Sequence, residues 1–409
     1  MGILCGQLSL GTEALKRPTL PDKGSRQAVP VFANGPLWML DVRALGYEAY
    51  PAARELRGGP PSAGPICFPT ERQVVVTFVT QQAPGPLPRR GQPDDSLPFR
   101  LHALFINAKT GHVDATREWP TASNLARVVP ALGGRFVVIT PDRLMLYSPD
   151  LELLKGLDLP ISREASRDAW EFLSSQGGRY LLLQFEPRTL EKEEADSSLR
   201  GVQLELVDVE NLEVIQKWRP KRWDFLTSLS DDRLALKMGG KIGRPEGPFH
   251  WLCSPAEPYC RGGRFLDDHT IFSDFLEYAT ISEKRMYFVS ISGELLFSER
   301  CPKGDLFREA FSADGRRLAL QVFKAKGGIS ALDIAPHYAL MRVMVYDIPS
   351  RRWVYTLDAK KQRIKMDPDR FSRELALSPD GSLLGLITQD GMLELYPLPE
   401  TSPPSSPTQ

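Results

Sequence analysis

The stretch from Phe311 to Phe323 reads FSADGRRLALQVF, and the stretch from Leu377 to Thr388 reads LSPDGSLLGLIT. In both, a short turn rich in Asp and Gly leads directly into an apolar strand. Five more segments repeat this pattern with other letters: PTERQVVVTFVT from Pro69, LGGRFVVIT from Leu132, QGGRYLLLQF from Gln176, SDDRLALKM from Ser230 and LDDHTIFSDF from Leu266. From the first segment to the last, the pattern returns about every 50 residues, a spacing typical of propeller blades.

A second pattern follows each of these strands, consisting of an apolar strand, a tight turn and another strand. It is clearest in LFINAKTGHVDATREWP from Leu104, LELVDVENLEVIQKWRP from Leu204 and MVYDIPSRRWVYTLDA from Met344. Asp, Asn, Ser, Pro and Gly occupy the turns because they accept positive φ or a preset φ. Together with an inner strand before each Asp/Gly turn, such as WEFLSS from Trp170, the pattern predicts four strands per unit.

The last unit is one strand short, because only DGMLELYPLP from Asp390 follows its second strand. We expect the N-terminal segment PLWMLDVRALGYEAYP from Pro36 to supply the missing strand and close the ring. The predicted fold is therefore all-β, a single propeller of seven four-stranded blades over residues 36–399. Residues 1–35 are expected to form a flexible N-terminal segment and residues 400–409 a disordered tail rich in Pro and Ser.

FSADGRRLALQVF and LSPDGSLLGLITQDGMLELYPL resemble the repeats of the bacterial WD40-like and YVTN-type β-propeller superfamily. The resemblance extends over roughly residues 36–399 and implies the fold. The regular Gly-His and Trp-Asp pairs of true WD40 repeats are missing, so the resemblance carries no particular role with it. Function has to be argued from the site, because this fold supports unrelated functions.

The bulk composition narrows the classes of partner. The 409 residues include 51 Lys plus Arg and 51 Asp plus Glu, so the formal net charge is zero and nucleic acid is not an expected partner. The longest apolar runs are too short to cross a bilayer, which argues against membrane insertion. The start MGILCGQLSLG lacks a basic region, so we expect a cytoplasmic protein, or a periplasmic or secreted one if the start codon is wrongly assigned. The protein is expected to be a monomer.

Long insertions are expected between the second and third strands of several blades, at residues 81–100, 186–201, 239–248 and 324–338. Because they occupy one repeat position, they should share one rim of the ring, where a protein, peptide or glycan would bind. These segments are equally well interpreted as surface loops that the fold accommodates at little cost and that bind nothing. The candidate binding residues on this rim are Arg89, Arg90, Asp94, Asp95, Arg244 and His337.

Four acidic residues lie near the start of inner strands: Glu171, Asp224, Glu309 and Glu374. If they converge at the mouth of the channel, they could bind a cation or a basic group. Surface ion pairs with neighbouring arginines are the more economical interpretation. We therefore favour a noncatalytic interaction propeller with no cofactor, no metal and no catalytic residue. The alternative is a lactonase-like or sugar-directed hydrolase that holds a divalent cation in the channel.

Other residues that could carry chemistry have structural explanations. Asp267, Asp268 and His269 look like metal ligands but occupy the turn position of the repeat, which favours a turn role. Cys253 and Cys260 flank SPAEPY and could form a disulfide in an exported protein, although two thiols are favoured. Trp119, Trp218 and Trp353 recur near the ends of outer strands, where they are expected to anchor the packing between blades.

Overall fold

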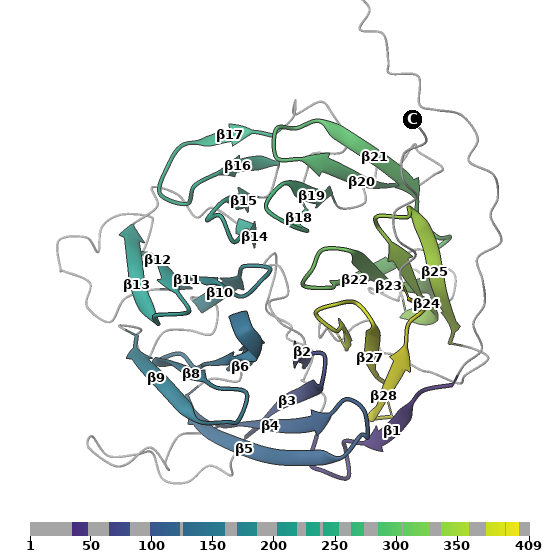
Figure 1. The fold of residues 1–409 in the computed structure, drawn as a ribbon, viewed down its shortest axis with the longest axis horizontal. Coiled ribbons are helices and arrows are strands. Elements are labelled where there is room, and N and C mark those ends of the chain that lie inside the picture. Colours follow the sequence, from purple (N-terminus) through teal and green to yellow (C-terminus); the bar gives the residue numbers. More distant parts are fainter. Residues whose placement is uncertain are drawn as a thin grey trace, which may run out of the picture.

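In a computed structural model of the protein, seven four-stranded antiparallel sheets form a closed ring around a central axis (Figure 1). In six sheets the strands follow chain order from the axis outward. The predicted seven-bladed all-β propeller is therefore confirmed. The structure describes residues 35–47, 65–81, 99–122, 126–159, 170–185, 203–218, 226–237, 240–252, 263–273, 285–304, 306–326, 337–359, 374–388 and 390–400.

The blades are numbered here in chain order. Blade 1 contains β2 (Ile66–Thr70), β3 (Gln73–Gln81), β4 (Phe99–Asn107) and β5 (Val113–Thr121). Blade 2 contains β6 (Arg127–Pro130), β7 (Phe136–Ile139), β8 (Arg143–Tyr147) and β9 (Leu153–Asp158), with the short 3-10 helix η2 (Leu132–Gly134) between its first two strands. Blade 3 contains β10 (Trp170–Ser174), β11 (Tyr180–Phe185), β12 (Gln203–Asp208) and β13 (Glu213–Trp218).

Blade 4 contains β14 (Leu226–Leu229), β15 (Ala235–Lys237), β16 (Lys241–Gly243) and β17 (Phe249–Trp251). Blade 5 contains β18 (Arg264–Phe265), β19 (Thr270–Ser273), β20 (Arg285–Ser290) and β21 (Leu295–Arg300). Blade 6 contains β22 (Leu306–Phe311), β23 (Arg317–Lys326), β24 (His337–Asp347) and β25 (Arg352–Asp358). Blade 7 contains β26 (Leu375–Leu377), β27 (Leu383–Ile387), β28 (Met392–Pro397) and the N-terminal strand β1 (Trp38–Asp41).

The hydrophobic core lies between blades, because successive side chains of a strand point to opposite faces of its sheet. In β7, Phe136 and Val138 pack against blade 1, while Val137 and Ile139 pack against blade 3. The same division between neighbours produces seven buried clusters among the described residues, one at each blade interface. No blade buries both of its faces alone, so each depends on its two neighbours. No helix in the described ranges is long and apolar enough to cross a bilayer.

Ring closure occurs as expected, through pairing of the two ends of the propeller within blade 7. β1 lies antiparallel to β28, with Trp38 opposite Leu395 and Asp41 opposite Met392. The indole nitrogen of Trp38 donates a hydrogen bond of 2.8 Å to the carbonyl of Ala108, so the closing strand also holds blade 1. Because β1 contacts the last and the first blade, it joins the ends of the ring.

We expect replacement of Trp38 by Ala to lower the free energy of unfolding by about 2–3 kcal/mol, because a half-buried indole and its hydrogen bond are lost. The control is Met39→Ala on the same strand, whose side chain is 57% exposed and should change stability by less than about 0.5 kcal/mol. Urea unfolding monitored by circular dichroism measures both values. Equal effects of the two substitutions would show that β1 does not carry the closure.

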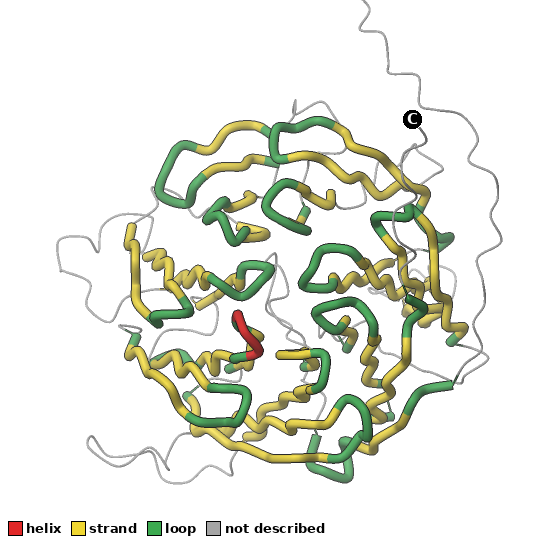
Figure 2. The backbone as a smooth tube through the Cα atoms, viewed as in Figure 1, coloured by secondary structure: helices red, strands yellow, loops and turns green. Residues whose placement is uncertain are grey.

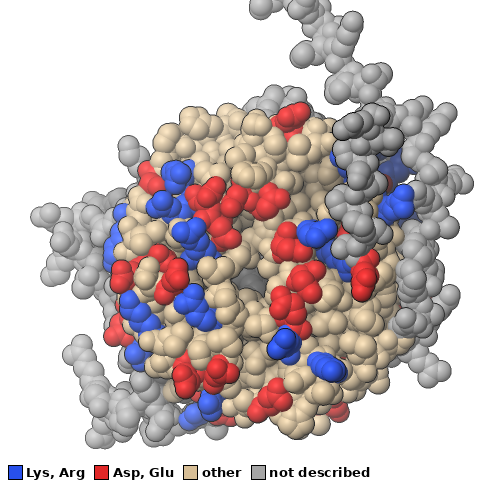
Figure 3. Space-filling model, viewed as in Figure 1, with Lys and Arg blue, Asp and Glu red and all other residues tan. Residues whose placement is uncertain are grey.

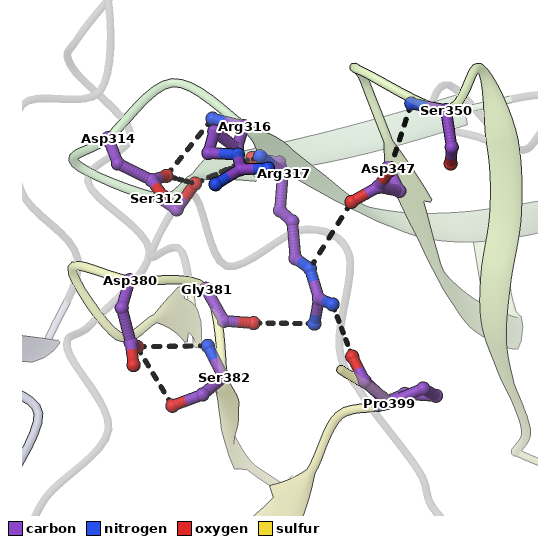
Figure 4. Close-up of polar contacts among 10 residues, drawn as sticks. All are labelled: Ser312, Asp314, Arg316, Arg317, Asp347, Ser350, Asp380, Gly381, Ser382 and Pro399. Atoms are coloured by element: carbon purple, nitrogen blue, oxygen red, sulfur yellow. Dashed lines mark hydrogen bonds and ion pairs between the residues drawn. The ribbon is translucent and has the colours of Figure 1, made fainter. Parts of the chain in front are cut away.

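A buried arginine reinforces the joint between blades 6 and 7 (Figure 4). Arg317 is 1% exposed, and its guanidinium donates hydrogen bonds to the carbonyls of Gly381, at 2.7 Å, and Pro399. Its Nε lies 3.7 Å from Asp347, which is also buried. Burial lowers the pKa of Arg317 from its ordinary value, and Asp347 opposes that shift. Gly381 has φ +69°, and a Cβ there would lie 2.8 Å from the Arg317 side chain, so this contact requires glycine.

Substitution of Arg317 by Leu should lower the free energy of unfolding by about 3–5 kcal/mol, because it leaves Asp347 buried without its counter-charge. The neighbouring residue provides the control, since Arg316 is exposed and Arg316→Leu should cost less than about 0.5 kcal/mol. Chemical denaturation of both variants tests this. A loss below about 1 kcal/mol for Arg317→Leu would contradict the role of the guanidinium in joining the blades.

Candidate functional site

One end of the ring carries the turns between the first and second strands of every blade, together with the turns between the third and fourth. We call this end the turn face; it is the face seen in Figures 1 and 2. The connections between second and third strands leave from the opposite end, because the strands alternate in direction. Along the axis lies a cavity of about 710 Å³, lined by inner strands and turns from all seven blades.

The inner turns owe their shape to short side chains that replace missing backbone partners. In blade 6, Ser312 donates to Asp314 at 2.5 Å, and the same carboxylate oxygen accepts the amide of Arg316 at 3.0 Å. In blade 7, Asp380 accepts from Ser378 at 2.7 Å and from the amide of Ser382 at 2.9 Å. These hydrogen bonds hold one oxygen of each carboxylate. The other oxygen of Asp314 and of Asp380 accepts none in the described structure.

Neighbouring turns are also tied to each other. Asp231 of blade 4 accepts hydrogen bonds from the hydroxyl of Ser175 at 2.5 Å and from the amide of Gly177 at 2.9 Å, both in blade 3. Asp268 of blade 5 accepts the amide of Asp232 in blade 4 at 3.2 Å. The inner turns of blades 3, 4 and 5 are thus hydrogen-bonded to one another rather than separate loops.

Acidic side chains gather along one side of the opening of the cavity (Figure 3). They belong to the inner turns of blades 4–7, and we call them the acidic arc: Asp231, Asp232, Asp267, Asp268, Asp314 and Asp380. Three basic or titratable residues follow them in the same turns, namely Arg233, His269 and Arg316. The acids are nevertheless in excess, so this side of the opening attracts positive charge.

The pKa values within the arc reflect two opposing effects. Burial raises the pKa of Asp268, and the nearby carboxylates of Asp232 and Asp231 raise it further. Burial also opposes ionisation of Asp380, but hydrogen bonds from Ser378 and Ser382 outweigh it and lower the pKa of that carboxyl. The arc therefore combines Asp380, whose pKa is lowered, with Asp268, whose pKa is raised first by burial and then by the like charges beside it.

A side chain of blade 3 reaches across the opening to blade 6. The amide nitrogen of Gln176 donates to the carbonyl of Ala313 at 3.3 Å, and the two turns face each other across the centre of the ring (Figure 2). This bond fixes the orientation of the amide, so its oxygen is also fixed. That oxygen is shielded from solvent and has no hydrogen-bond partner. Leu132, which is 46% exposed, also lines the cavity.

The acidic residues expected at the channel mouth do not form one group in the described structure. Glu309 pairs with Arg264 of blade 5 at 3.2 Å, and neither it nor Glu374 lines the cavity. Glu374 is 2% exposed, and its carboxylate accepts a hydrogen bond of 3.5 Å from the hydroxyl of Tyr47. Glu171 lies in β10, but its side chain is outside the described part, as is all of Asp224. Their role at the channel mouth stays a prediction.

Most of the predicted insertion rim lies outside the described residues, including Arg89, Arg90, Asp94 and Asp95. His337 begins β24 at the expected end of blade 6, although its side chain is not described. For residues 239–248 the expectation was wrong: β16 lies within this segment and pairs with both β15 and β17. Arg244 therefore starts the turn between β16 and β17, on the turn face. The strands of blade 4 are too short for their periodicity to be recognised.

The structural explanations offered for Asp267 and for the three tryptophans are confirmed. Asp267 accepts the amides of His269 and Thr270, each at 2.7 Å, as a turn residue does. Trp119, Trp218 and Trp353 each pack against a core cluster between blades. Cys253 and Cys260 lie outside the described residues. Within the described ranges, no three His, Cys, Asp or Glu residues are grouped as metal ligands.

The chain is similar to known proteins in its structure. No family model matches the chain, and no curated protein matches its sequence. Raptor from Chaetomium thermophilum is similar with a TM-score of 0.51 and 11% identity, over 91% of this chain and 29% of that one. The WD40 domain of Neurospora crassa Pan2 gives a TM-score of 0.45 and 10% identity, over 92% of this chain and 100% of that one.

The fold is that of a seven-bladed β-propeller. At these identities the likeness concerns the fold alone, and the site has to be judged on its own residues. The sequence had not singled out Gln176, Arg317 or Asp231 as individually important. The only signal was that all three belong to the repeated turns.

Cys67 on β2 also lines the cavity. From its buried environment we predict that its thiol reacts slowly with alkylating reagents. Burial raises the pKa of its thiol to about 12. Near pH 8.5, fewer than about one molecule in a thousand should therefore carry the thiolate, compared with about half for an ordinary cysteine. We expect iodoacetamide to leave Cys67 unmodified in the folded protein and to modify it after unfolding in guanidinium chloride, as mass spectrometry of its peptide can show. Rapid labelling in the folded state would contradict this environment.

Proposed function

We propose that this propeller is a noncatalytic interaction module that binds a protein or peptide partner on its turn face. The observation that carries the proposal is the cavity of about 710 Å³ on the axis, which is lined by inner strands and turns of all seven blades. This volume lies within the range of pockets that hold specific ligands. Hydrogen bonds within and between the turns support a preorganised surface, which reduces the entropy lost on binding.

The chemistry around the opening also favours binding. Leu132 and Ala313 expose apolar surface on the same face as the carboxylates of the acidic arc. An apolar centre with a charged border is typical of protein interfaces, in which buried contacts supply affinity and charges supply orientation. The known propellers to which the chain is similar support this role only through their shared fold. The insertion rim on the opposite end stays a prediction as a second contact surface.

The test begins by capturing proteins from a lysate of the source organism on the immobilised full-length chain. The partner is then purified, and its affinity is measured for two variants by isothermal titration calorimetry. Leu132→Arg places a charge at the opening and should weaken binding at least about tenfold. Leu153→Arg, on the outer strand β9, where Leu153 is 52% exposed, is the matched control and should bind normally.

Two results would oppose the proposal. If Leu132→Arg binds every captured partner as tightly as the unmodified chain, the turn face is not the interface. If the purified protein instead holds one divalent cation per chain and hydrolyses lactones or glycosides only with that cation, the channel is an enzyme site. Metal analysis together with assays of those two substrate classes distinguishes this outcome from simple binding.

A further inference from the structure

We infer that the joint between blades 3 and 4 on the turn face binds the phosphate of a phosphorylated side chain in a peptide segment of the partner. This inference rests on the proposed function and names the chemistry of its ligand. It combines three observations: two arginines converge on one tyrosine ring, neither has a carboxylate partner in the described structure, and the hydroxyl of that tyrosine has no hydrogen-bond partner there either.

The two arginines come from different blades and meet at Tyr180. This tyrosine is the first residue of β11, and its ring packs into the apolar cluster between blades 3 and 4. Arg179 lies in the turn between β10 and β11, and its Cζ is 5.3 Å from the centre of the ring. Arg233 lies in the turn between β14 and β15, and its Cζ is 6.0 Å from the same centre. These cation–π contacts hold both guanidiniums at one buried ring.

The charges of the two arginines are not neutralised within the described part of the chain. Both side chains are exposed, and neither forms an ion pair with a described carboxylate. Asp231 accepts the backbone amide of Arg179 at 3.4 Å, and its carboxylate is also occupied by Ser175 and Gly177. Each guanidinium therefore keeps its N–H donors for another group. An anion bound to both would offset the repulsion between the two like charges.

Tyr180 adds a third donor at the same place. Only 6% of this residue is exposed, so the position of its ring is set by the packing between the blades. Its hydroxyl forms no hydrogen bond in the described structure, and it is not one of the enclosed polar atoms without a partner there. A phosphomonoester has three terminal oxygens and a charge of about −1.5 to −2 near pH 7, which suits two guanidiniums and a hydroxyl. A carboxylate offers only two oxygens and one charge.

The other charges on the turn face favour one isolated phosphate over a polyanion. The acidic arc lies on this face, and Asp231 and Asp232 directly precede Arg233 in its turn. Nucleic acid or an anionic membrane would bring many negative charges against these carboxylates. A single phosphate on a peptide places its charge at the arginine pair alone. The ligand that fits is therefore a phosphorylated serine, threonine or tyrosine of a polypeptide.

The first experiment identifies the anion with fluorescein-labelled peptide libraries of random sequence around one fixed central residue. That residue is phosphoserine, phosphothreonine, phosphotyrosine, the unphosphorylated form of each, or glutamate. We expect at least one phosphorylated library to bind the full-length protein at least about tenfold more tightly than its unphosphorylated form and than the glutamate library, because a dianion gains more from two guanidiniums. Fluorescence polarisation measures the affinities, and excess single-stranded DNA should not displace the phosphorylated peptides.

The second experiment places the binding. The double variant Arg179→Gln and Arg233→Gln removes both guanidiniums and should weaken binding of the phosphorylated library at least about tenfold. The matched control is Arg72→Gln with Arg316→Gln, two exposed arginines in the inner turns of blades 1 and 6. It removes the same charge from the same face and should leave the affinity unchanged. Tyr180→Phe should weaken binding about threefold, through loss of one hydrogen bond. Thermal melts confirm that the variants fold.

The outcomes separate this inference from the proposed function. If phosphorylated peptides bind no better than unphosphorylated or glutamate peptides, or are displaced by the DNA, the inference is overturned while the interaction module stands. The same holds if the Arg179/Arg233 variant binds them as well as the control does. If no library binds the intact chain, the inference is overturned as well, and the partner captured from the lysate decides the proposed function alone. Binding that requires both the phosphate and the arginine pair supports the inference.

Discussion

The structure depends on the pairing of β1 with β28, because a propeller has no core of its own inside any single blade. Every blade divides its apolar side chains between two neighbours, as Val137 and Phe136 of β7 illustrate. An open row of blades would leave one apolar face uncovered at each end. The four-residue strand β1 helps to prevent this, since it completes blade 7 and contacts blade 1 through Trp38. The channel and its rim exist only because this closure holds.

The joint between blades 6 and 7 adds a different kind of interaction to its apolar cluster. Arg317 contributes hydrogen bonds to two backbone carbonyls and has a buried carboxylate partner. A buried ion pair adds little net stability compared with apolar side chains, but it tolerates very few arrangements of its neighbours. Gly381 illustrates this restriction, because its missing Cβ makes room for the arginine stem. We therefore interpret the arginine as fixing the position of the inner turns at this joint, where Asp314 and Asp380 lie.

Rigid turns would let a repeat that serves folding also present a binding surface, as the proposed function requires. Asp314 and Asp380 each use one carboxylate oxygen to shape their turns, and the other accepts no hydrogen bond from the described residues. Asp231 instead accepts hydrogen bonds from the turn of blade 3 with both of its carboxylate oxygens. The same residue type therefore has both carboxylate oxygens occupied by hydrogen bonds in one blade and only one of them in another. This difference in hydrogen bonding arises from how closely adjacent turns approach each other. Gln176 is the residue that spans the opening.

The repeat length, the four-stranded unit and the closing strand were all predictable from the sequence, because turn residues and alternating apolar residues are local signals. Blade 4 was misplaced in part, since three-residue strands such as β16 leave no periodicity to detect and its Gly and Pro residues suggested a loop. The acidic residues at inner strands were recognisable, but their partners were not: Glu374 meets Tyr47, 327 positions away. Sequence alone determined the architecture, because it repeats. Only the tertiary structure decided which carboxylates meet at the opening and that Gln176 crosses it, because those contacts join different blades and depend on how the ring closes.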